Sequence, residues 1–243
     1  RTGDHGTLTQ SITTLVAAAA REHFIHADPP NPCGETQQET TMHKLLSDSP
    51  GEKMLLLGNE AIARGAFEAG VAFASTYPGT PSSEISANFF QMTQESDLYF
   101  EYSTNEKVAM EVAAAAANSG VHSMCVMKHV GVNVAADALM TLAYVGVQGG
   151  LVVVSADDPS LHSSQNEQDN RNYAFAAKLP MLEPCDPEEA KEYLKTAYWL
   201  SEGYDTPVIV KGISFHRVEV PFYRFAEYTP QVALRVDYAK AII

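Results

Sequence analysis

The chain has 243 residues, 45% of them hydrophobic, which is enough to bury a sizeable core in one large or two small domains. Acidic residues outnumber basic ones, 30 to 16, and the formal net charge of -14 argues against nucleic acid and anionic membranes as partners. No stretch reaches the roughly 18 apolar residues of a membrane-spanning helix, and residues 15–20 lack the flanks of a signal peptide. We therefore expect a globular, cytoplasmic protein.

The three cysteines, Cys33, Cys125 and Cys185, lie far apart and form no C-x-x-C pair. Such spacing supports neither a disulfide framework nor a local zinc or iron–sulfur site. We expect incidental or buried thiols. Any iron–sulfur cluster that serves this protein has its ligands on another chain or another region of the polypeptide.

Residues 1–52 differ in composition from the rest of the chain. They are rich in Thr, Gln, His and Pro, and residues 28–41 contain almost no apolar side chain, which is typical of an arm or linker. One helix is expected there, over residues 8–23. We divide the chain into this arm, a domain at residues 53–214 and a C-terminal extension at residues 215–243.

From residue 53 onward, short apolar runs alternate with amphipathic segments, which predicts an α/β fold with a parallel sheet between two layers of helices. Residues 215–220 suit an edge strand or an arm that packs on a partner, and equally a solvated tail. The expected strands are residues 54–57, 73–76, 98–102, 123–127, 151–155 and 208–211. The expected helices are residues 59–68, 82–94, 105–118, 133–142, 165–178 and 187–202, with Asn59, Ser82 and Thr104 at helix starts.

An alanine-rich helix that begins with a glutamate is the first candidate for chemistry. Apolar neighbours favour the neutral form of Glu106, whereas the helix dipole favours the charged form. A carboxyl kept neutral would suit a proton relay. Glu111 lies about 140° further round the helix, so only one of the two can face a shared ligand. The alternative for Glu106 is a first-turn acid or an ion-pair partner of Lys107 or Arg64.

A loop that contains proline and glycine follows the second predicted strand, a position where α/β proteins bind ligands. It comprises Tyr77, Pro78, Gly79 and Thr80. The proline and glycine predict a tight turn, and the hydroxyl of Thr80 can bind a ligand or cap the next helix. Both roles remain open.

A second loop, with Lys128 and His129, follows the apolar run at residues 123–127 and opens a helix. Backbone N–H groups and two possible cations meet there, which suits an anionic carboxylate. Simple solvation of both side chains is the alternative. Asn133 is equally suited to capping the helix.

The long polar loop at residues 157–171 cannot belong to a core. Its carboxylates Asp157 and Asp158 have no further ligand at a spacing typical of Mg²⁺ or Ca²⁺. We therefore expect an interface or lid segment and no metal site.

Together these residues resemble the 2-oxoacid:ferredoxin oxidoreductases, and within that family the indolepyruvate branch. The resemblance spans about residues 53–212. Five ordered motifs carry it: LLLGNEAIARGAFEAGV (55–71), YPGTPSSEI (77–85), NEKVAMEVAAAAANSG (105–120), MKHVGVNVAADALM (127–140) and SADDPSLHSSQNEQDNR (155–171).

The resemblance implies the pyrimidine-binding domain of a thiamine-diphosphate enzyme. In that fold Glu106 matches the glutamate that contacts a ring nitrogen of the aminopyrimidine, which activates the cofactor's amine to take the thiazolium proton. Tyr77, Pro78 and Gly79 match the loop that lines the cofactor. Thr80 matches a threonine that faces the 2-oxoacid.

The implied function is oxidative decarboxylation of an aryl 2-oxoacid, such as indolepyruvate, to the acyl-coenzyme A, with electrons passed to ferredoxin. Pyruvate-type members carry an arginine near Ser155-Ala156-Asp157, and its absence favours a larger substrate. The resemblance places Mg²⁺ with the cofactor's diphosphate, and the iron–sulfur clusters, on another domain or subunit. Two alternatives are a thiamine-dependent decarboxylase or transketolase-type component without ferredoxin, and a non-catalytic assembly subunit.

Overall fold

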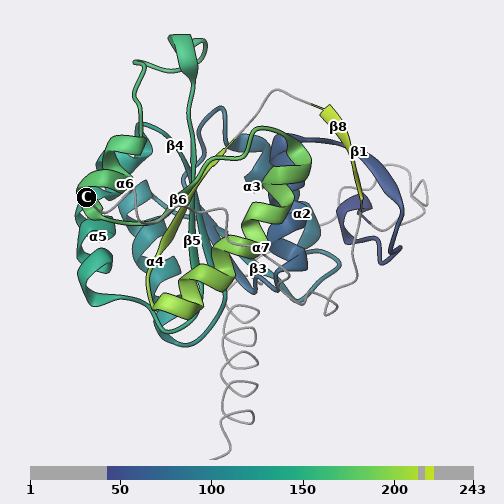
Figure 1. Cartoon of the computed structure of the whole chain (residues 1–243), viewed down its shortest axis with the longest axis horizontal. Coiled ribbons are helices and arrows are strands. Elements are labelled where there is room, and N and C mark those ends of the chain that lie inside the picture. Colours follow the sequence, from purple (N-terminus) through teal and green to yellow (C-terminus); the bar gives the residue numbers. More distant parts are fainter. Residues whose placement is uncertain (1–42, 213–216, 222–243) are drawn as a thin grey trace, which may run out of the picture.

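A six-stranded parallel sheet lies at the centre of the computed structural model, which describes residues 43–212 and 217–221 (Figure 1). The helix expected over residues 8–23 lies outside the described residues. The strand order is β3-β2-β4-β5-β7-β6. The strands are β2 Phe73–Thr76, β3 Tyr99–Tyr102, β4 Ser123–Lys128, β5 Leu151–Ala156, β6 Met181–Leu182 and β7 Val208–Gly212.

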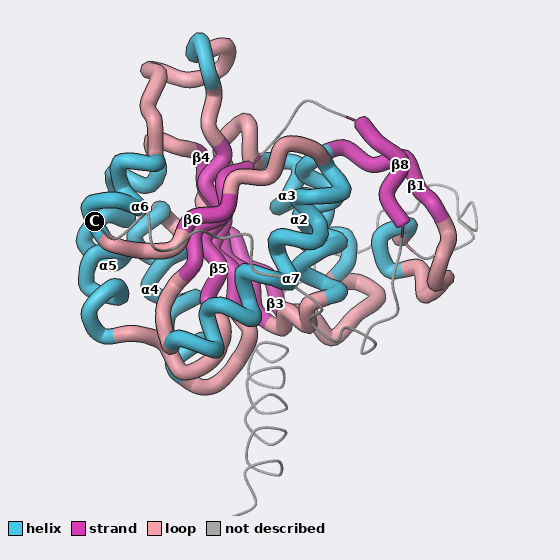
Figure 2. The backbone as a smooth tube through the Cα atoms, in the orientation of Figure 1, coloured by secondary structure: helices cyan, strands magenta, loops and turns pink. Residues whose placement is uncertain are grey.

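Helices cover both faces of this sheet, so the expected three-layer α/β architecture is confirmed. Figure 2 shows one helical layer on either side of the strands. One layer contains α2 Gly58–Glu68, α3 Ser83–Met92 and α7 Pro187–Tyr204. The other contains α4 Glu106–Asn118, α5 Gly131–Val145 and α6 Arg171–Ala177.

The inner strands β4 and β5 are buried along almost their whole length because each of their two faces packs on a helical layer. On β4, Met124 and Val126 belong to the core beneath α2, α3 and α7. Cys125 and Met127, which alternate with them, belong to the core beneath α4, α5 and α6. Two cores therefore share one sheet.

A glycine allows α2 and α7 to approach each other closely. A Cβ atom added at Gly65 would lie 2.5 Å from the backbone oxygen of Lys191. The charged side chains around this contact are buried, and Arg64 and Lys195 both pair with Glu68. The two helices thus pack backbone to backbone, with an ion-pair network at their interface.

The first predicted strand forms, but it does not join the parallel sheet. β1 (Lys53–Leu57) pairs antiparallel with β8 (Arg217–Pro221) in a separate two-stranded ladder (Figure 1). Leu55 is half exposed, so this strand lacks the burial on both faces that a central parallel strand needs. β8 lies mostly within residues 215–220, for which an edge strand was one of the expected structures.

Residues 43–46 pack against the domain ahead of β1. The 3₁₀ helix η1 (Lys44–Leu46) buries Leu45 and Leu46 in the core beneath α2. A second 3₁₀ helix, η2 (Pro159–Leu161), lies at the tip of the polar loop after β5.

The helix predicted over residues 165–178 is wrong in its first half, because α6 begins only at Arg171. β6, with two residues, was not predicted. Asn105, not Thr104, is the N-cap of α4, and its side chain accepts a hydrogen bond from the Val108 N–H at 2.9 Å. None of the described helices combines the length and hydropathy needed to cross a bilayer.

Candidate functional site

The predicted site segments lie along one edge of the sheet. The strands are parallel and paired in register, with Thr76 beside Tyr102 and Val126, and Lys128 beside Ala156. Their carboxyl ends therefore open on the same side, where ligands of α/β proteins bind. The loops after β2, β3, β4 and β5 all begin at this edge.

Glu106 is the first residue of α4, and it is buried, with 8% of its surface exposed. Its carboxylate forms no hydrogen bond or ion pair with any described residue. Lys107 pairs instead with Asp137 at 2.9 Å, and Arg64 donates to Glu68 at 2.8 Å. The ion-pair alternative for Glu106 is therefore wrong for both partners that the sequence suggested.

The Glu106 side chain lies against the start of α5. A Cβ atom added at Gly131 would lie 2.7 Å from Glu106 Cγ and 2.8 Å from Oε1. Cys125 of β4 is also close to Glu106. The pKa of its thiol is raised to about 12, mainly by burial. A hydrogen bond with Ser75 lowers this pKa, and the negative charge of the Glu106 carboxylate raises it further. Glu106, which has no partner among the described residues, thus lies against Gly131 and near the buried thiol of Cys125.

Glu111, the second glutamate of α4, points elsewhere. Its side chain is more than half exposed and lies 3.9 Å from Lys107. Of the two acids considered from the sequence, only Glu106 faces the interior.

The loop after β2 is open to solvent at its tip. Tyr77, Pro78 and Thr80 are exposed, whereas Gly79 lies beneath the side chain of Lys128. A Cβ atom at Gly79 would lie 3.0 Å from Cδ of that lysine, so the loop after β2 is in contact with the last residue of β4. No described residue forms a hydrogen bond with the Thr80 hydroxyl, so it does not cap α3.

A cis peptide bond joins Thr80 to Pro81, and a buried asparagine supports it. The Asn59 amide donates to the Pro81 carbonyl at 2.8 Å and to Glu84 Oε2 at 2.7 Å. The prediction that Asn59 caps α2 is wrong, since that helix begins at Gly58 and the amide faces the loop. Asn59 is thus part of the support of the site.

The two basic residues at the end of β4, Lys128 in the strand and His129 after it, have different environments. Lys128 is partly exposed and its Nζ donates to Gln165 Oε1 at 3.1 Å. His129 is fully buried, and its Nε2 lies 3.0 Å from the carbonyl oxygen of Asn166. Because a carbonyl can only accept, Nε2 carries the hydrogen. Nδ1 has no partner among the described residues.

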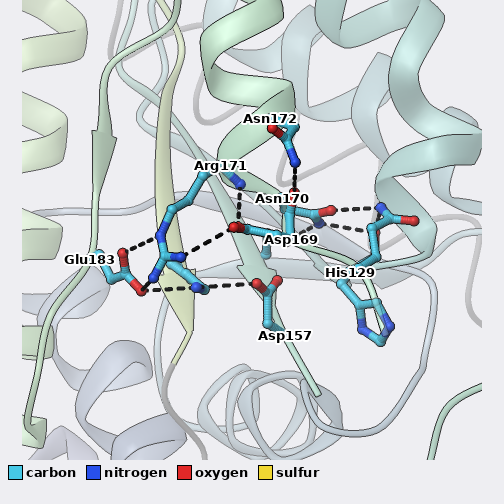
Figure 3. Close-up of polar contacts among 10 residues, drawn as sticks. His129, Asp157, Asp169, Asn170, Arg171, Asn172 and Glu183 are labelled. Atoms are coloured by element: carbon cyan, nitrogen blue, oxygen red, sulfur yellow. Dashed lines mark hydrogen bonds and ion pairs between the residues drawn. The ribbon is translucent and has the colours of Figure 1, made fainter. Parts of the chain in front are cut away.

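A chain of ion pairs closes the same edge above β5, β7 and β6 (Figure 3). Lys211 bridges Asp157 at 3.3 Å and Glu183 at 2.8 Å, and Arg171 bridges Glu183 at 2.6 Å and Asp169 at 3.2 Å. Burial raises the pKa of Asp157 against the opposing effect of Lys211. The hydrogen bond from Arg171 is the main cause that lowers the pKa of Glu183 to about 2.

These charges do not form a metal centre. Within residues 43–212 and 217–221, no group of three or more His, Cys, Asp or Glu side chains has an arrangement that could hold a metal ion. The ion pairs instead fasten the two ends of the polar loop to the sheet.

Two amide side chains at this edge were not predicted from the sequence. Gln168 and Asn170 both donate to the backbone oxygen of His129, at 3.1 and 3.0 Å. They lie in the half of the predicted helix that did not form. No spacing or motif distinguished them from the other polar residues of the loop.

A family model described as pyruvate flavodoxin/ferredoxin oxidoreductase, thiamine-diphosphate-binding, matches residues 64–219. A solved structure of 2-oxoglutarate:ferredoxin oxidoreductase from Magnetococcus marinus is similar in fold. Its TM-score is 0.66 at 19% identity, and the match covers 87% of this chain and 36% of that one.

Curated relatives include the indolepyruvate oxidoreductase subunit IorA of Methanothermobacter thermautotrophicus, 56% identical over 170 residues, and that of Archaeoglobus fulgidus, 55% identical over 175 residues. Each match covers 70% of this chain and 28% of the relative. The 2-oxoglutarate synthase subunit KorA of the first organism is 30% identical, with 66% of this chain and 44% of the relative covered. The chain thus spans little more than a quarter of the IorA relatives. Because the family model covers more than half of its residues, the chain belongs to the pyruvate flavodoxin/ferredoxin oxidoreductase family through its thiamine-diphosphate-binding domain.

Proposed function

We propose that this chain supplies the pyrimidine side of a thiamine-diphosphate site in a 2-oxoacid:ferredoxin oxidoreductase. The reaction is the oxidative decarboxylation of an aryl 2-oxoacid such as indolepyruvate, with coenzyme A as acyl acceptor and ferredoxin as electron acceptor. The similarity to IorA subunits supports this choice of substrate.

One observation carries the proposal: Glu106, of which only 8% is exposed, has a carboxyl without a partner among the described residues, at the edge of the sheet where ligands bind. A carboxyl that lies in a largely buried residue and forms no hydrogen bond within the described structure is available to a ligand that supplies one. A ring nitrogen of an aminopyrimidine provides such a partner, so the residues present fit the cofactor. When bound, thiamine diphosphate supplies the nucleophilic carbon that attacks the 2-oxoacid.

The roles of the surrounding residues follow from their positions. Glu106 would form a hydrogen bond with the pyrimidine ring, and Gly131 packs against the glutamate side chain. Tyr77, Pro78 and Gly79 line the cofactor, and the free hydroxyl of Thr80 faces the substrate. Their exposure fits a surface that a second domain completes.

The loop after β4 completes the assignment on this chain. The Lys128 ammonium binds the carboxylate of the 2-oxoacid, and it reaches the open edge of the sheet. His129 is buried, so its contribution to substrate binding is made by supporting the end of β4, which carries Lys128.

The remaining parts of the catalyst lie outside this domain. We assign the diphosphate and its Mg²⁺ to a second domain or subunit, and the iron–sulfur clusters to another chain or region. Those clusters would carry the electrons to ferredoxin. We place the assembled enzyme in the cytoplasm.

Replacing Glu106 by Gln in the assembled enzyme tests the proposal. The amide keeps the shape of the side chain but loses its acid–base function, so turnover should fall by about 10²-fold or more. Glu111→Gln is the matched control on the same helix and should retain normal turnover, because Glu111 is exposed. Equal turnover of the two variants would reject an active site here and favour a non-catalytic assembly subunit.

Analysis of the natively purified complex addresses the electron acceptor. We expect thiamine diphosphate, Mg²⁺ and iron–sulfur clusters together, and reduction of ferredoxin that depends on both 2-oxoacid and coenzyme A. Thiamine diphosphate without iron in any chain of the complex would instead favour a decarboxylase or a transketolase-type enzyme.

A further inference from the structure

The end of the polar loop, residues 165–170, docks on the turn between β4 and α5. Gln165 accepts a hydrogen bond from Lys128 Nζ, and the Asn166 carbonyl accepts one from His129 Nε2. Figure 2 shows the rest of this loop projecting away from the body of the molecule, with η2 at its tip. The segment therefore connects a protruding loop with a turn that lines the site.

Asn170 is at the centre of this contact, and only 1% of it is exposed. Its Nδ2 donates to the His129 carbonyl at 3.0 Å and to Ser155 Oγ at 2.6 Å (Figure 3). Its Oδ1 accepts from Gln168 Nε2 at 2.6 Å. The amide is thus fully used in the interior, where it joins β5 to the turn after β4.

The position of Asn170 in the chain favours a different use of its side chain. It stands at the N-cap of α6, a position for which asparagine is among the preferred residues, yet its side chain makes no capping hydrogen bond. Asp169 Oδ1 accepts from the Arg171 N–H at 3.0 Å instead. The Asn170 side chain therefore bonds to the His129 carbonyl and does not cap α6.

That contact acts on the position of Gly131. The His129 carbonyl, two residues earlier, also accepts from the Val132 N–H at 3.2 Å, so it defines the first turn of α5. The Glu106 side chain lies so close to Gly131 that there is no room for a methyl group between them. A shift of the turn by a few tenths of an ångström therefore changes the space available to the Glu106 carboxyl.

We propose that Asn170 is a positioning residue of the cofactor site, which holds the β4–α5 turn so that Gly131 keeps Glu106 in its working orientation. The proposal rests on the proposed function, because it assigns a purpose to the orientation of Glu106. Asn170 acts through the turn and need not touch the cofactor or substrate.

Asn170→Asp separates this role from helix capping. Aspartate has the same shape and is an equally good N-cap, but it replaces the two N–H donors with an oxygen that faces the His129 carbonyl. Asn172→Asp is the matched control, with the same charge change on the same helix, because the Asn172 amide is exposed and bonds only to the Asp169 carbonyl. Gln168→Glu is a milder second variant that removes the other donor to His129.

The first measurement is the dissociation constant of thiamine diphosphate with Mg²⁺ for the assembled oxidoreductase, by titration calorimetry. We expect about a tenfold weaker affinity for Asn170→Asp, a smaller loss for Gln168→Glu and no change for Asn172→Asp. Amide hydrogen exchange of the cofactor-free assembly should be faster at residues 130–133 in the first two variants only.

Steady-state kinetics separate positioning from general loss of structure. We expect kcat to fall about tenfold for Asn170→Asp while KM for the 2-oxoacid stays within twofold. In a double-mutant cycle with Glu106→Gln, the two substitutions should be non-additive in kcat, because Asn170 acts through Glu106.

The outcomes distinguish the inference from the proposed function. If the wild-type assembly does not bind thiamine diphosphate, the proposed function fails, and this inference with it. If the wild type binds but Asn170→Asp matches Asn172→Asp in affinity and kcat, the inference alone is overturned. Additive effects in the cycle would also overturn it. Should Asn170→Asp not assemble, the same comparison between Gln168→Glu and the control decides.

Discussion

Gly131 shows why the site needs a residue without a side chain. Its Cα lies against Glu106, and a Cβ atom there would approach both Cγ and Oε1 of the glutamate to less than 3 Å. The sequence places this glycine in a recognisable motif, but only the structure identifies the glutamate as its neighbour. One residue thus fixes the space available to the candidate acid.

Gly131→Ala should reduce turnover by about tenfold or more, because the new methyl group forces the Glu106 carboxyl out of its place. It should also destabilise the protein by about 1–3 kcal/mol through overpacking. Steady-state kinetics and chemical denaturation measure the two effects.

The origin of this effect can be tested by shortening the acid. Combining Gly131→Ala with Glu106→Ala should recover most of the lost stability, since the methyl group then has room. Activity should stay low in the double variant. A double variant as unstable as the single one would show that the added methyl group clashes elsewhere.

Most helices and the longer strands were predictable because their patterns are strong. Alternation of apolar runs with amphipathic segments predicted β2, β4, β5 and β7 to within one residue at each end. β6 was missed because two residues carry no periodicity, and its strand character comes from pairing with β7. Among the strands of the parallel sheet, only the two-residue β6 was too short to leave a pattern in the sequence.

The helix predicted over residues 165–178 failed in part for a tertiary reason. Gln168 and Asn170 have side chains that bond to the backbone of another segment, and this holds residues 165–170 in a non-helical path. Helix propensity depends on the local sequence and contains no information about such a distant partner. The loops of the site were predictable from motifs, whereas their supports, Asn59 and Asn170, depend on contacts between segments far apart in the chain.

The packing of α2 against α7 depends on Gly65. We expect Gly65→Ala to lower the free energy of unfolding by about 1–3 kcal/mol, because the added Cβ would meet the backbone of Lys191, which cannot rotate away. Chemical denaturation of the purified chain measures this change.

Gly203 in the last turn of α7 provides the control. No atom lies within 4 Å of a Cβ added there, so Gly203→Ala should leave stability unchanged or raise it by about 0.4–1 kcal/mol. Similar losses for both variants would mean that the α2–α7 contact is not the cause.

Two carboxyls above β5, β6 and β7, those of Glu183 and Asp157, make the stability of the whole molecule depend on pH in opposite directions. The pKa of Glu183 is lowered to about 2, mainly by Arg171, so its stabilising contribution is complete above pH 4.5 and is lost as pH falls towards 2. The pKa of Asp157 is raised by burial, so its contribution is complete below pH 3.8 and is lost as pH rises through the raised value.

Glu183→Gln should therefore be less stable than the wild type at pH 7, and the difference should shrink between pH 4.5 and 2. Asp157→Asn should show the reverse trend and gain relative to the wild type as pH rises above 3.8. Urea denaturation across this pH range, with the free energy of unfolding compared at each pH, measures both. Parallel curves for either variant and the wild type would contradict the assignment for that residue.

The ladder of β1 and β8 has a mechanical consequence. Lys53 is paired with Pro221 and Leu57 with Arg217, so residues 53 and 221 lie side by side at one end of the ladder. Tension applied between residues 53 and 221 would open this antiparallel ladder one pair at a time, from its outer end, before any load reached the parallel strands. A pair of fluorophores at these two positions would therefore lose energy transfer at low force, while the sheet that carries the site stayed folded.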